Sequence, residues 1–270
     1  MIKYLVIGNP IEHSLSPLIH NYWIKKYGLA ESIYEKKKVE KKDLEKIVEQ
    51  VRNGELKGVN VTVPFKKDII PFLDGLDDVA KKTLSVNTLC KVKEEVWGYN
   101  TDAKGFDDSL KKEGINYRDK NIFIIGSGGV TSSILYHLTL YAKKVYVTNR
   151  TKEKAHLLKT KDTTGKIEVV DWGQVPNNCN LIINTTSIGL NKDERINLNF
   201  KDYEKNKDVL FYDLIYNPIE TNFLMNARLR GNKTMNGKMM FLNQAQTAFQ
   251  IWTKIVVEID DKLIDLLDND

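Results

Sequence analysis

The sequence predicts an α/β protein of two domains, and three observations lead to that fold class. Short β-rich segments alternate with helical segments throughout the chain, a pattern typical of folds with mainly parallel sheets. The 270 residues are enough for two domains of ordinary size, each with its own core. Near the middle of the chain, a strand leads into a glycine-rich turn and a helix, which indicates a doubly wound parallel sheet in one domain.

The expected strands are short apolar segments, most of them rich in β-branched and aromatic residues. They cover residues 3–7, 33–39, 58–63, 86–92, 121–125, 144–148, 181–184 and 209–214, with a further strand indicated near 167–170. Helices are expected between them, for example over residues 18–26, 43–52, 102–112 and 131–141. Neither a repeat nor a low-complexity segment interrupts this series, so the domain boundaries must be inferred from motifs.

A last long helix is expected from Met239 onward. Its apolar residues fall at intervals of three and four and form one stripe, made of Phe241, Ala245, Ala248, Trp252 and either Ile255 or Val256. Gln244 is expected on the same buried side of this helix. A buried amide needs hydrogen-bond partners, so Gln244 is either a structural amide or a binding residue.

Composition excludes several classes of protein. With 41% hydrophobic and 29% charged residues, and no apolar run near the length that crosses a bilayer, the chain is typical of globular proteins. The apolar stretch at the N-terminus is too short for a secretory signal, so we expect a cytoplasmic protein. Cys90 and Cys179 stand far apart and in no metal-like spacing, so neither a disulfide framework nor a metal site is predicted.

The net charge of +5 does not by itself indicate a nucleic-acid partner. The lysines of residues 35–38, 40–43 and 111–113 are interleaved with acidic residues, which is typical of solvated surfaces. A modest positive field suits small anionic ligands equally well. We therefore expect a small-molecule partner, and neither nucleic acid nor a membrane.

Residues 121–131 carry a nucleotide-binding motif. The apolar strand ends in Gly-Ser-Gly-Gly-Val-Thr, where Gly126 permits a tight turn and Gly128 lets a pyrophosphate approach the backbone. Amide groups at the start of the next helix would then meet the phosphate charge. The third position of the motif usually holds a small residue for close packing of helix against strand, and this chain has Thr131 there.

The choice between NAD and NADP depends on the end of the next strand, about twenty residues further on. An NAD site places an acidic residue there, but this sequence reads Asn149-Arg150-Thr151-Lys152. A guanidinium can bind a 2′-phosphate through paired charge-assisted hydrogen bonds, whereas a carboxylate would repel it. The alternative, a surface arginine at a strand end, is less favoured at this distance from Gly128. The predicted cofactor is NADP.

Four polar clusters precede this motif, and each closes a strand or opens a helix. They are Ser14-Leu-Ser16, Asn60-Val-Thr-Val-Pro-Phe-Lys66, Ser85-Val-Asn87-Thr88 and Gly98-Tyr-Asn-Thr-Asp102. Taken singly, each has an ordinary explanation as a helix cap, a turn residue or a surface cation. Their order and combination are more informative than any single cluster.

In that order, the clusters resemble the signature segments of the shikimate dehydrogenase family. The resemblance continues through the glycine-rich turn and Asn149-Arg150-Thr151, and then through residues 184–189, 213–218 and 237–245. It spans nearly the whole chain, and so many motifs would rarely occur in one order by chance.

The resemblance implies a division of the chain into two domains. Residues 1–102 would form a substrate-binding domain completed by C-terminal helices in residues 237–270, and residues 103–236 would form a Rossmann-like NADP domain. Departures from the family pattern occur at Val130 and Thr131, where smaller residues are usual, and at Leu190, where methionine is usual near the nicotinamide.

The resemblance also implies which residues form the sites. The carboxylate or ring hydroxyls of the substrate would be held by Ser14, Ser16, Thr62, Asn87, Tyr216 and Gln244. The cofactor would be held by Gly126, Ser127, Gly128, Gly129, Val130, Asn149, Arg150, Thr151, Leu214 and Gly237. Lys66 and Asp102 would flank the reacting oxygen.

The implied reaction is the reversible, NADPH-dependent reduction of 3-dehydroshikimate to shikimate, on the pathway to chorismate and the aromatic amino acids. The cofactor supplies the hydride. The ammonium of Lys66 can stabilise negative charge on the oxygen and exchange the proton with it, and we expect Asp102 to orient Lys66.

Two alternatives stay open at this point. A quinate or dual quinate/shikimate dehydrogenase is the nearer one, although Ser16 and the Asn149-Arg150-Thr151 segment favour shikimate. A non-catalytic NADP-sensing regulator is disfavoured because both Lys66 and Asp102 are present. The oligomeric state is expected to be a monomer or a homodimer.

Overall fold

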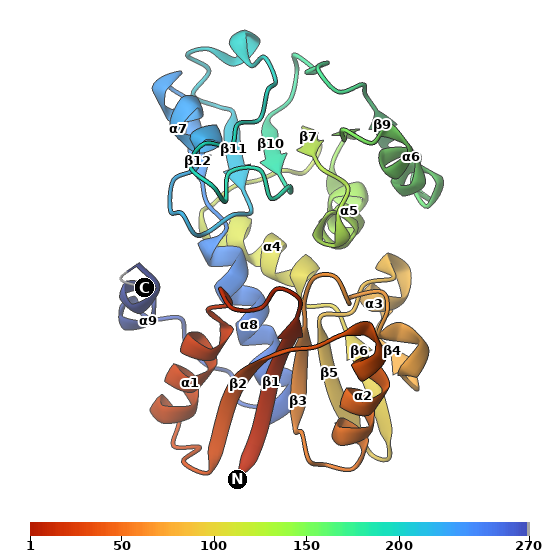
Figure 1. The fold of residues 1–270 in the computed structure, drawn as a ribbon. Coiled ribbons are helices and arrows are strands. Elements are labelled where there is room, and N and C mark those ends of the chain that lie inside the picture. Colours follow the sequence, from red (N-terminus) through yellow and green to blue (C-terminus); the bar gives the residue numbers. More distant parts are fainter. Residues whose placement is uncertain (269–270) are drawn as a thin grey trace. The chain divides into compact units, whose positions relative to one another are not determined.

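The protein has the predicted α/β fold with two domains (Figure 1), as seen in a computed structural model that describes residues 1–268. One compact unit comprises Met1–Phe106 and Leu242–Asp270, and the other comprises Asp107–Phe241. The chain leaves the first unit within helix α4 (Asp102–Lys112) and returns to it within helix α8 (Lys238–Thr253). The last two residues of the expected C-terminal segment, 269–270, lie outside the described residues.

A mixed sheet forms the centre of the first unit, with strand order β2-β1-β3-β5-β6-β4. Its strands are β1 (Ile2–Gly8), β2 (Ser32–Lys38), β3 (Gly58–Val61), β4 (Gly75–Leu76), β5 (Thr88–Val92) and β6 (Glu95–Tyr99). Strand β5 is antiparallel to both β3 and β6. Only Lys93 and Glu94 join β5 to β6, and so short a connection joins antiparallel strands. The other pairs of this sheet, β1 with β2, β1 with β3 and β4 with β6, are parallel, so the expectation of mainly parallel pairing is confirmed.

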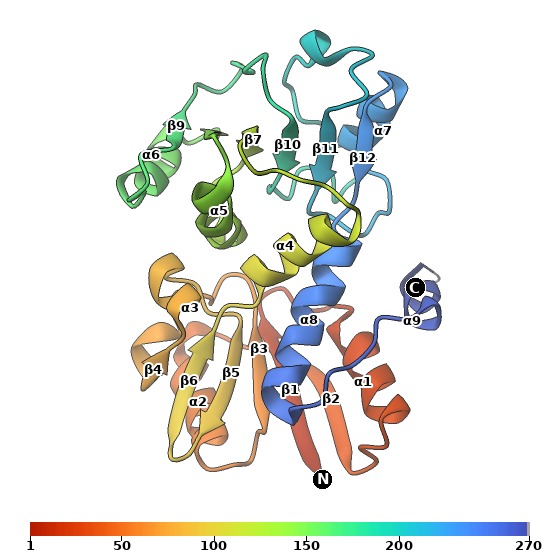
Figure 2. The ribbon, with the colours of Figure 1, turned by 180° about the vertical axis from the view of Figure 1, so that it is seen from behind.

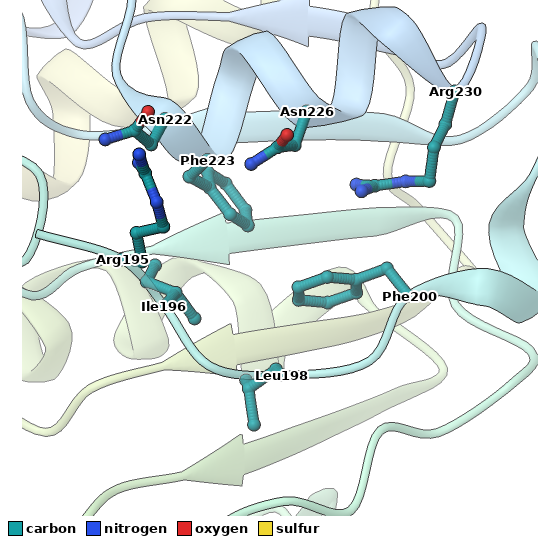
Figure 3. Close-up of a pocket in the computed structure, with 8 residues that line it drawn as sticks. All are labelled: Arg195, Ile196, Leu198, Phe200, Asn222, Phe223, Asn226 and Arg230. Atoms are coloured by element: carbon teal, nitrogen blue, oxygen red, sulfur yellow. The ribbon is translucent and has the colours of Figure 1, made fainter.

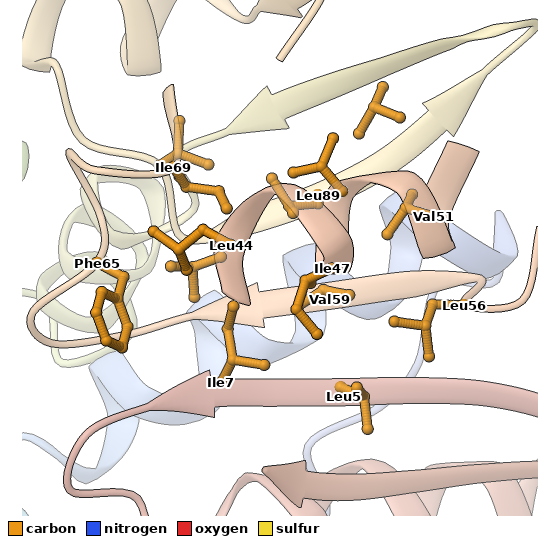
Figure 4. Close-up of a cluster of buried hydrophobic side chains, with 14 of the residues drawn as sticks. Leu5, Ile7, Leu44, Ile47, Val51, Leu56, Val59, Phe65, Ile69 and Leu89 are labelled. Carbon is orange, nitrogen blue, oxygen red and sulfur yellow. The ribbon is translucent and has the colours of Figure 1, made fainter. Parts of the chain in front are cut away.

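Helices cover both faces of this sheet. On one face, α2 (Leu44–Arg52) packs apolar side chains at helical spacing against inward-facing strand residues such as Leu5 and Ile7 (Figure 4). On the other face lie α1 (Ser16–Lys26) and the part of α8 from Leu242 onward (Figure 2), where the Trp252 indole donates to the Leu89 carbonyl at 2.9 Å. The shorter helices of this unit are η1 (Lys41–Asp43), η2 (Ile70–Phe72), α3 (Asp78–Thr83) and α9 (Asp261–Asp268).

Helix α8 ends earlier than its apolar stripe predicts. Ala245, Ala248 and Trp252 are buried as expected, but the helix stops at Thr253, and Lys254 has a φ of 62°. A residue in the left-handed region ends a helix, so neither Ile255 nor Val256 belongs to it. The Val256 side chain is accordingly exposed.

An entirely parallel sheet forms the second unit, with strand order β12-β11-β10-β7-β8-β9. Its strands are β7 (Asn121–Ile125), β8 (Lys144–Thr148), β9 (Ile167–Val169), β10 (Leu181–Asn184), β11 (Leu210–Asp213) and β12 (Lys233–Met235). Strands β7, β8 and β10 have the predicted bounds, whereas β12 was not predicted. The strand order reverses between β7 and β10, and such a switch point is where doubly wound sheets bind ligands.

Both faces of this second sheet are buried. Phe123 and Ile125 of β7 pack into one apolar cluster, and the alternate residues Ile122 and Ile124 are equally buried on the opposite face. This is the pattern of a parallel sheet covered by helices. The helices that lie wholly in this unit are α5 (Gly129–Tyr141), α6 (Lys152–Thr160), η3 (Lys201–Tyr203) and α7 (Asn222–Leu229).

A small cavity of about 80 Å³ lies beside α7 (Figure 3). The guanidinium of Arg230 lies at its edge, 5.5 Å from the ring centre of Phe200 and 5.1 Å from that of Phe211. These distances are typical of cation–π packing, so the arginine has a structural role there. Within residues 1–268, none of the helices has the length and apolarity that crossing a membrane requires.

Candidate active site

Lys66 and Asp102 form a close, largely buried ion pair. Lys66 lies in the turn that follows β3, and Asp102 is the first residue of α4. The Lys66 Nζ donates to Asp102 Oδ2 at 2.6 Å, and the side chains are only 14% and 7% exposed. A charge-assisted hydrogen bond in such a site holds the ammonium in one place. The structure thus brings together the two residues that sequence reasoning singled out for the chemistry.

Asp102 does not cap the helix that it begins. The Asn100 side chain takes that role, because its Oδ1 accepts from the amides of Asp102 and Ala103 at 3.1 and 3.4 Å. Helix capping, which is the ordinary explanation for an aspartate at the start of a helix, therefore does not account for Asp102. It accepts instead from Lys66 and from Asn87, whose Nδ2 lies 2.9 Å from Asp102 Oδ1.

Asn87 is fixed in turn by a buried polar network. Its Oδ1 accepts from the Thr101 amide at 2.9 Å, and its Nδ2 donates to Thr101 Oγ1 at 2.9 Å as well as to Asp102. Thr101 Oγ1 also donates to Gln244 Oε1 at 3.4 Å. Gln244 is only partly buried, where its helical pattern predicted a buried amide. Asn87 and Gln244 therefore belong to the same cluster as the ion pair.

The two predicted serines lie at the start of α1. Ser16 is buried and hydrogen-bonded to Tyr34, and the Tyr34 hydroxyl donates to Asn60 Oδ1 at 2.6 Å. Asn60 Nδ2 then donates to the Asn87 carbonyl at 3.0 Å. Burial raises the pKa of Tyr34 well above its usual value, so this hydroxyl is a hydrogen-bond donor at neutral pH. A continuous polar chain connects Ser16 to Asn87.

Ser14 contacts this cluster through Ser16, and Thr62 follows β3, the strand that contains Asn60. Ser14 is partly buried, and its Oγ accepts from the Ser16 amide at 3.4 Å. Thr62 is partly buried just beyond β3, where its amide donates to the Ile7 carbonyl at 2.9 Å. A Cβ on Gly8 would lie 2.6 Å from the Thr62 methyl carbon, so glycine is required there for close approach.

Sequence reasoning assigned no role to four members of this cluster, namely Tyr34, Asn60, Asn100 and Thr101. A polar residue inside an apolar strand is a detectable signal, and Asn60 within β3 provides one. Tyr34 has no such signal, because only the pairing of β1 with both β2 and β3 places its ring beside Asn60.

Tyr216 differs from the other predicted substrate residues because it belongs to the second unit. It follows β11, and its ring stacks on Phe241 with 4.3 Å between centroids and planes 4° apart. Burial raises the pKa of its hydroxyl to about 12. The phenol therefore stays protonated at neutral pH and can donate a hydrogen bond.

The glycine-rich turn leads from β7 into α5. Gly126 has a φ of 116°, and a Cβ there would lie 2.4 Å from Thr185 Oγ1, so the fold itself requires glycine. Gly128 caps α5 with an ordinary φ of −74°, and a Cβ there would meet nothing within 4 Å. Protein packing therefore does not require glycine at position 128, and the open space beside it is what a ligand approaching the start of a helix would need. Ser127, Gly129 and Val130 complete the turn and are partly buried.

The predicted 2′-phosphate segment follows β8. Asn149 is partly buried and its Nδ2 donates to the Thr151 carbonyl at 2.8 Å, while Arg150 and Thr151 are exposed. The pKa of Glu194 is lowered, mainly by hydrogen bonds from the Gly189 and Asn191 amides and to a smaller extent by the charge of Arg150. An exposed guanidinium at the end of the strand after the glycine-rich turn suits a phosphate monoester.

Leu214 and Gly237, both predicted to contact the cofactor, lie against each other. The Gly237 amide donates to the Ile215 carbonyl at 3.0 Å, and a Cβ on Gly237 would lie 2.0 Å from the Leu214 oxygen. Close backbone packing therefore explains this glycine without a ligand. Leu190, where the family pattern has methionine, is 53% exposed.

Asp213 at the end of β11 is a buried carboxyl that sequence reasoning quoted without a role. It accepts from Thr221 Oγ1 at 2.6 Å, from Asn184 Nδ2 at 3.0 Å and from the Ile215 amide at 3.1 Å. Burial raises its pKa to about 6 despite these hydrogen bonds. The network joins the loops after β10 and β11.

Two family profiles match this chain. Residues 6–89 match the profile described as the shikimate dehydrogenase substrate binding domain. Residues 108–223 match the profile described as shikimate / quinate 5-dehydrogenase. Together, the two matches cover most of the chain.

Individual proteins show the same similarity over their full lengths. The chain is 48% identical to the shikimate dehydrogenase (NADP(+)) of Pelagibacter ubique over 98% of both chains. The crystal structure of shikimate dehydrogenase from Aquifex aeolicus has a TM-score of 0.89, with 36% identity over 100% of this chain and 97% of that one. A structure of shikimate 5-dehydrogenase from Thermus thermophilus in complex with NADP(H) and shikimate has a TM-score of 0.88, with 29% identity over 100% and 99%.

Proposed function

Because this chain belongs to the shikimate dehydrogenase family, we propose that it catalyses the reversible, NADPH-dependent reduction of 3-dehydroshikimate to shikimate. This reaction is an oxidoreduction on the pathway to chorismate and the aromatic amino acids. The observation that carries the proposal is the buried Lys66–Asp102 pair held against Asn87, since a reduction of this kind needs a positioned proton donor.

Lys66 is the proposed proton donor in the direction of reduction. Its ammonium has three N–H donors, and Asp102 accepts one of them at 2.6 Å. Another donor can meet the substrate oxygen, stabilise the negative charge that develops on it, and transfer the proton. In the reverse reaction Lys66 receives that proton from the hydroxyl. Bound NADPH supplies the hydride that reaches the carbonyl carbon.

Asp102 is the proposed orienting partner of Lys66. One carboxylate oxygen accepts from Lys66 and the other from Asn87, so the carboxylate is held on both sides. With Asn87 also bound to Thr101, the ammonium is directed by groups that have little freedom to move. Such preorganisation reduces the reorganisation needed when charge develops on the substrate.

Hydroxyl and amide groups of the first unit, together with the Tyr216 hydroxyl of the second, suit a substrate with a carboxylate and several ring hydroxyls. We assign substrate binding to Ser14, Ser16, Thr62, Asn87, Tyr216 and Gln244. Hydroxyls donate to carboxylate oxygens, and amides both donate to and accept from hydroxyls. Residues 1–102 and 237–270, which include most of the first unit, are thereby proposed as the substrate-binding domain.

Residues 103–236, which include most of the second unit, are the proposed NADP-binding domain. The turn from Gly126 to Val130 would hold the pyrophosphate through backbone amides. Arg150, supported by Asn149 and Thr151, would bind the 2′-phosphate. Leu214 and Gly237 would contact the nicotinamide end of the cofactor.

We further propose that the enzyme acts in the cytoplasm as a monomer or a homodimer. Both cysteines, Cys90 and Cys179, are buried free thiols, as expected for a reducing compartment. Light scattering on the purified protein would determine the number of subunits.

The activity is tested by supplying purified protein with shikimate or quinate and with NADP or NAD, in all four combinations. Reduction of the nicotinamide is followed by its absorbance. Quinate is included because the profile over residues 108–223 carries both substrate names. We expect the highest kcat/KM with shikimate and NADP. Activity with quinate alone, or no activity in any combination, would overturn the proposal.

A further inference from the structure

Thr131 occupies the position where the nucleotide-binding motif usually has a small residue. It lies in the first turn of α5, is completely buried, and has its Oγ1 2.8 Å from Thr185 Oγ1. Thr185 directly follows β10, the strand beside β7 at the switch point of the sheet. The larger residue is therefore accommodated by a specific partner.

The direction of the hydrogen bonds follows from the second contact of Thr185. Thr185 Oγ1 donates to the Ile125 carbonyl at 2.9 Å, which uses the one hydrogen of this hydroxyl. Thr131 must then be the donor in the bond between the two hydroxyls. The result is a relay from Thr131 through Thr185 to the Ile125 carbonyl, and hydrogen bonds in such a chain polarise one another.

The relay ends on the peptide group that begins the glycine-rich turn. Ile125 is the last residue of β7, and its carbonyl carbon belongs to the same peptide as the Gly126 nitrogen. The Thr185 amide also donates to the Ile125 carbonyl at 2.9 Å, and the Gly126 amide donates to the Thr148 carbonyl at 2.8 Å. Both ends of this peptide are therefore held, and Thr185 Oγ1 occupies the space where a Gly126 Cβ would lie.

We propose that Thr131 is a positioning residue for NADP: its hydroxyl, acting through Thr185, holds the Ile125–Gly126 peptide where the pyrophosphate-binding turn begins. In this chain, hydrogen bonding would replace the close packing that a small residue normally provides. The inference rests on the proposed binding of NADP by this turn.

The motif by itself leads to the opposite expectation. If Thr131 were only a tolerated departure from the pattern, Thr131→Ala would restore the usual small residue and leave NADP binding equal or tighter. If the relay positions the turn, the same substitution weakens binding. The relay therefore predicts a higher Kd of NADP for Thr131→Ala, whereas the motif alone predicts an unchanged or lower one.

The test measures the Kd of NADP by calorimetry for the full-length protein and its variants, together with kcat at saturating NADP and shikimate. We expect Thr131→Ala and Thr131→Val to raise the Kd about fivefold, the effect of losing one hydrogen bond, with kcat unchanged. Thr131→Ser keeps the hydroxyl, so its Kd should stay close to that of the unaltered protein. An unchanged or lower Kd for Thr131→Ala would overturn the proposal.

Two controls separate positioning from general loss of structure. Thr131→Ser and Thr131→Ala have similar volumes, so an equal rise of Kd in both would show that packing and not the hydroxyl matters, and would also overturn the proposal. Thr131→Val combined with Thr185→Val should weaken binding no more than Thr185→Val alone, because both substitutions break the same relay. If the unaltered protein bound no NADP, the proposed function itself would fail together with the inference.

Discussion

The two units of this protein prepare their sites in opposite ways. In the first unit, the polar groups are already paired with one another: Lys66 with Asp102, Asp102 with Asn87, and Asn87 with Thr101. In the second unit, Arg150 is exposed and the turn at Gly128 has open space beside it. A proton-transfer group must be oriented before the reaction, whereas a phosphate-binding surface needs accessible cations and amides.

Each unit also contains a buried ionisable group whose pKa is shifted strongly, and the two shifts have opposite directions. In the first unit, His20 lies in an aromatic cluster, stacked on Tyr34 at 4.2 Å, and burial lowers its pKa to about 3. In the second unit, burial raises the pKa of Asp213 to about 6. Burial disfavours the charged form in both cases, but the two groups respond to pH in opposite directions.

The largest expected effect is the loss of catalysis in Lys66→Ala. Because the first unit is proposed to supply the proton, kcat should fall by about 10² to 10⁴, the range attributed to general acid–base catalysis. The Kd of NADP should be unchanged, because the residues proposed to bind it lie in the second unit. Steady-state kinetics and calorimetry measure the two quantities. Lys67→Ala is the matched control and should keep its activity, and near-normal turnover in Lys66→Ala would exclude Lys66 from the reaction.

The next largest effect is the acid sensitivity caused by His20. Its pKa is about 6.5 in the unfolded chain and about 3 in the folded one, so only the unfolded chain takes up this proton between those values. Stability is therefore lost as pH falls through this window, by up to about 1.4 kcal/mol per pH unit. Urea unfolding followed by the fluorescence of Trp23 and Trp252 measures it. In His20→Phe the slope should be reduced, and an unaltered slope would contradict the assignment.

Asp213 should produce a smaller effect of the opposite sign. Its folded pKa of about 6 lies above its usual value of 3.8, so the stabilisation by protonation is complete below pH 4 and is lost as pH rises through 6. The shift corresponds to about 2–3 kcal/mol. Hydrogen exchange of β10 and β11, corrected for intrinsic rates, should show this dependence in the unaltered protein and a flatter one in Asp213→Asn. Equal dependence in both proteins would show that another group is responsible.

The smallest expected effect concerns the choice of cofactor. Arg150→Ala should raise the KM for NADP about tenfold or more, as expected when a charged hydrogen-bond donor is lost, and should change the KM for NAD much less. Lys152→Ala is a suitable control because Lys152 is exposed on the same segment and pairs with Asp171 at 2.5 Å. An equal rise of KM for both cofactors would refute the contact between Arg150 and the 2′-phosphate. The second unit would then lack the accessible cation that distinguishes it from the first.

Local patterns predicted the second unit more accurately than the first. Strands β7, β8 and β10 have the predicted bounds, because strands that are buried on both faces are nearly continuous apolar runs. The glycine-rich turn and Arg150 are also local motifs. In the first unit, β6 was not predicted, and β5 begins two residues after its predicted start. The limits of these two strands are set by their pairing in a hairpin and not by a run of apolar residues.

From periodicity and short motifs, the sequence by itself predicted the α/β class, the glycine-rich turn and Arg150, because neighbouring residues encode these features. The inserted second domain and the roles of Lys66 and Asp102 were implied by the resemblance to a family, which the order of several motifs carries. Only the tertiary structure decided that Asn100 caps α4 and leaves the Asp102 carboxylate for Lys66, and that Thr131 has a partner in Thr185. The Lys66–Asp102 and Thr131–Thr185 contacts join residues that are 36 and 54 positions apart in the chain, so no local pattern encodes them. Burial then favours the pairing of these polar groups.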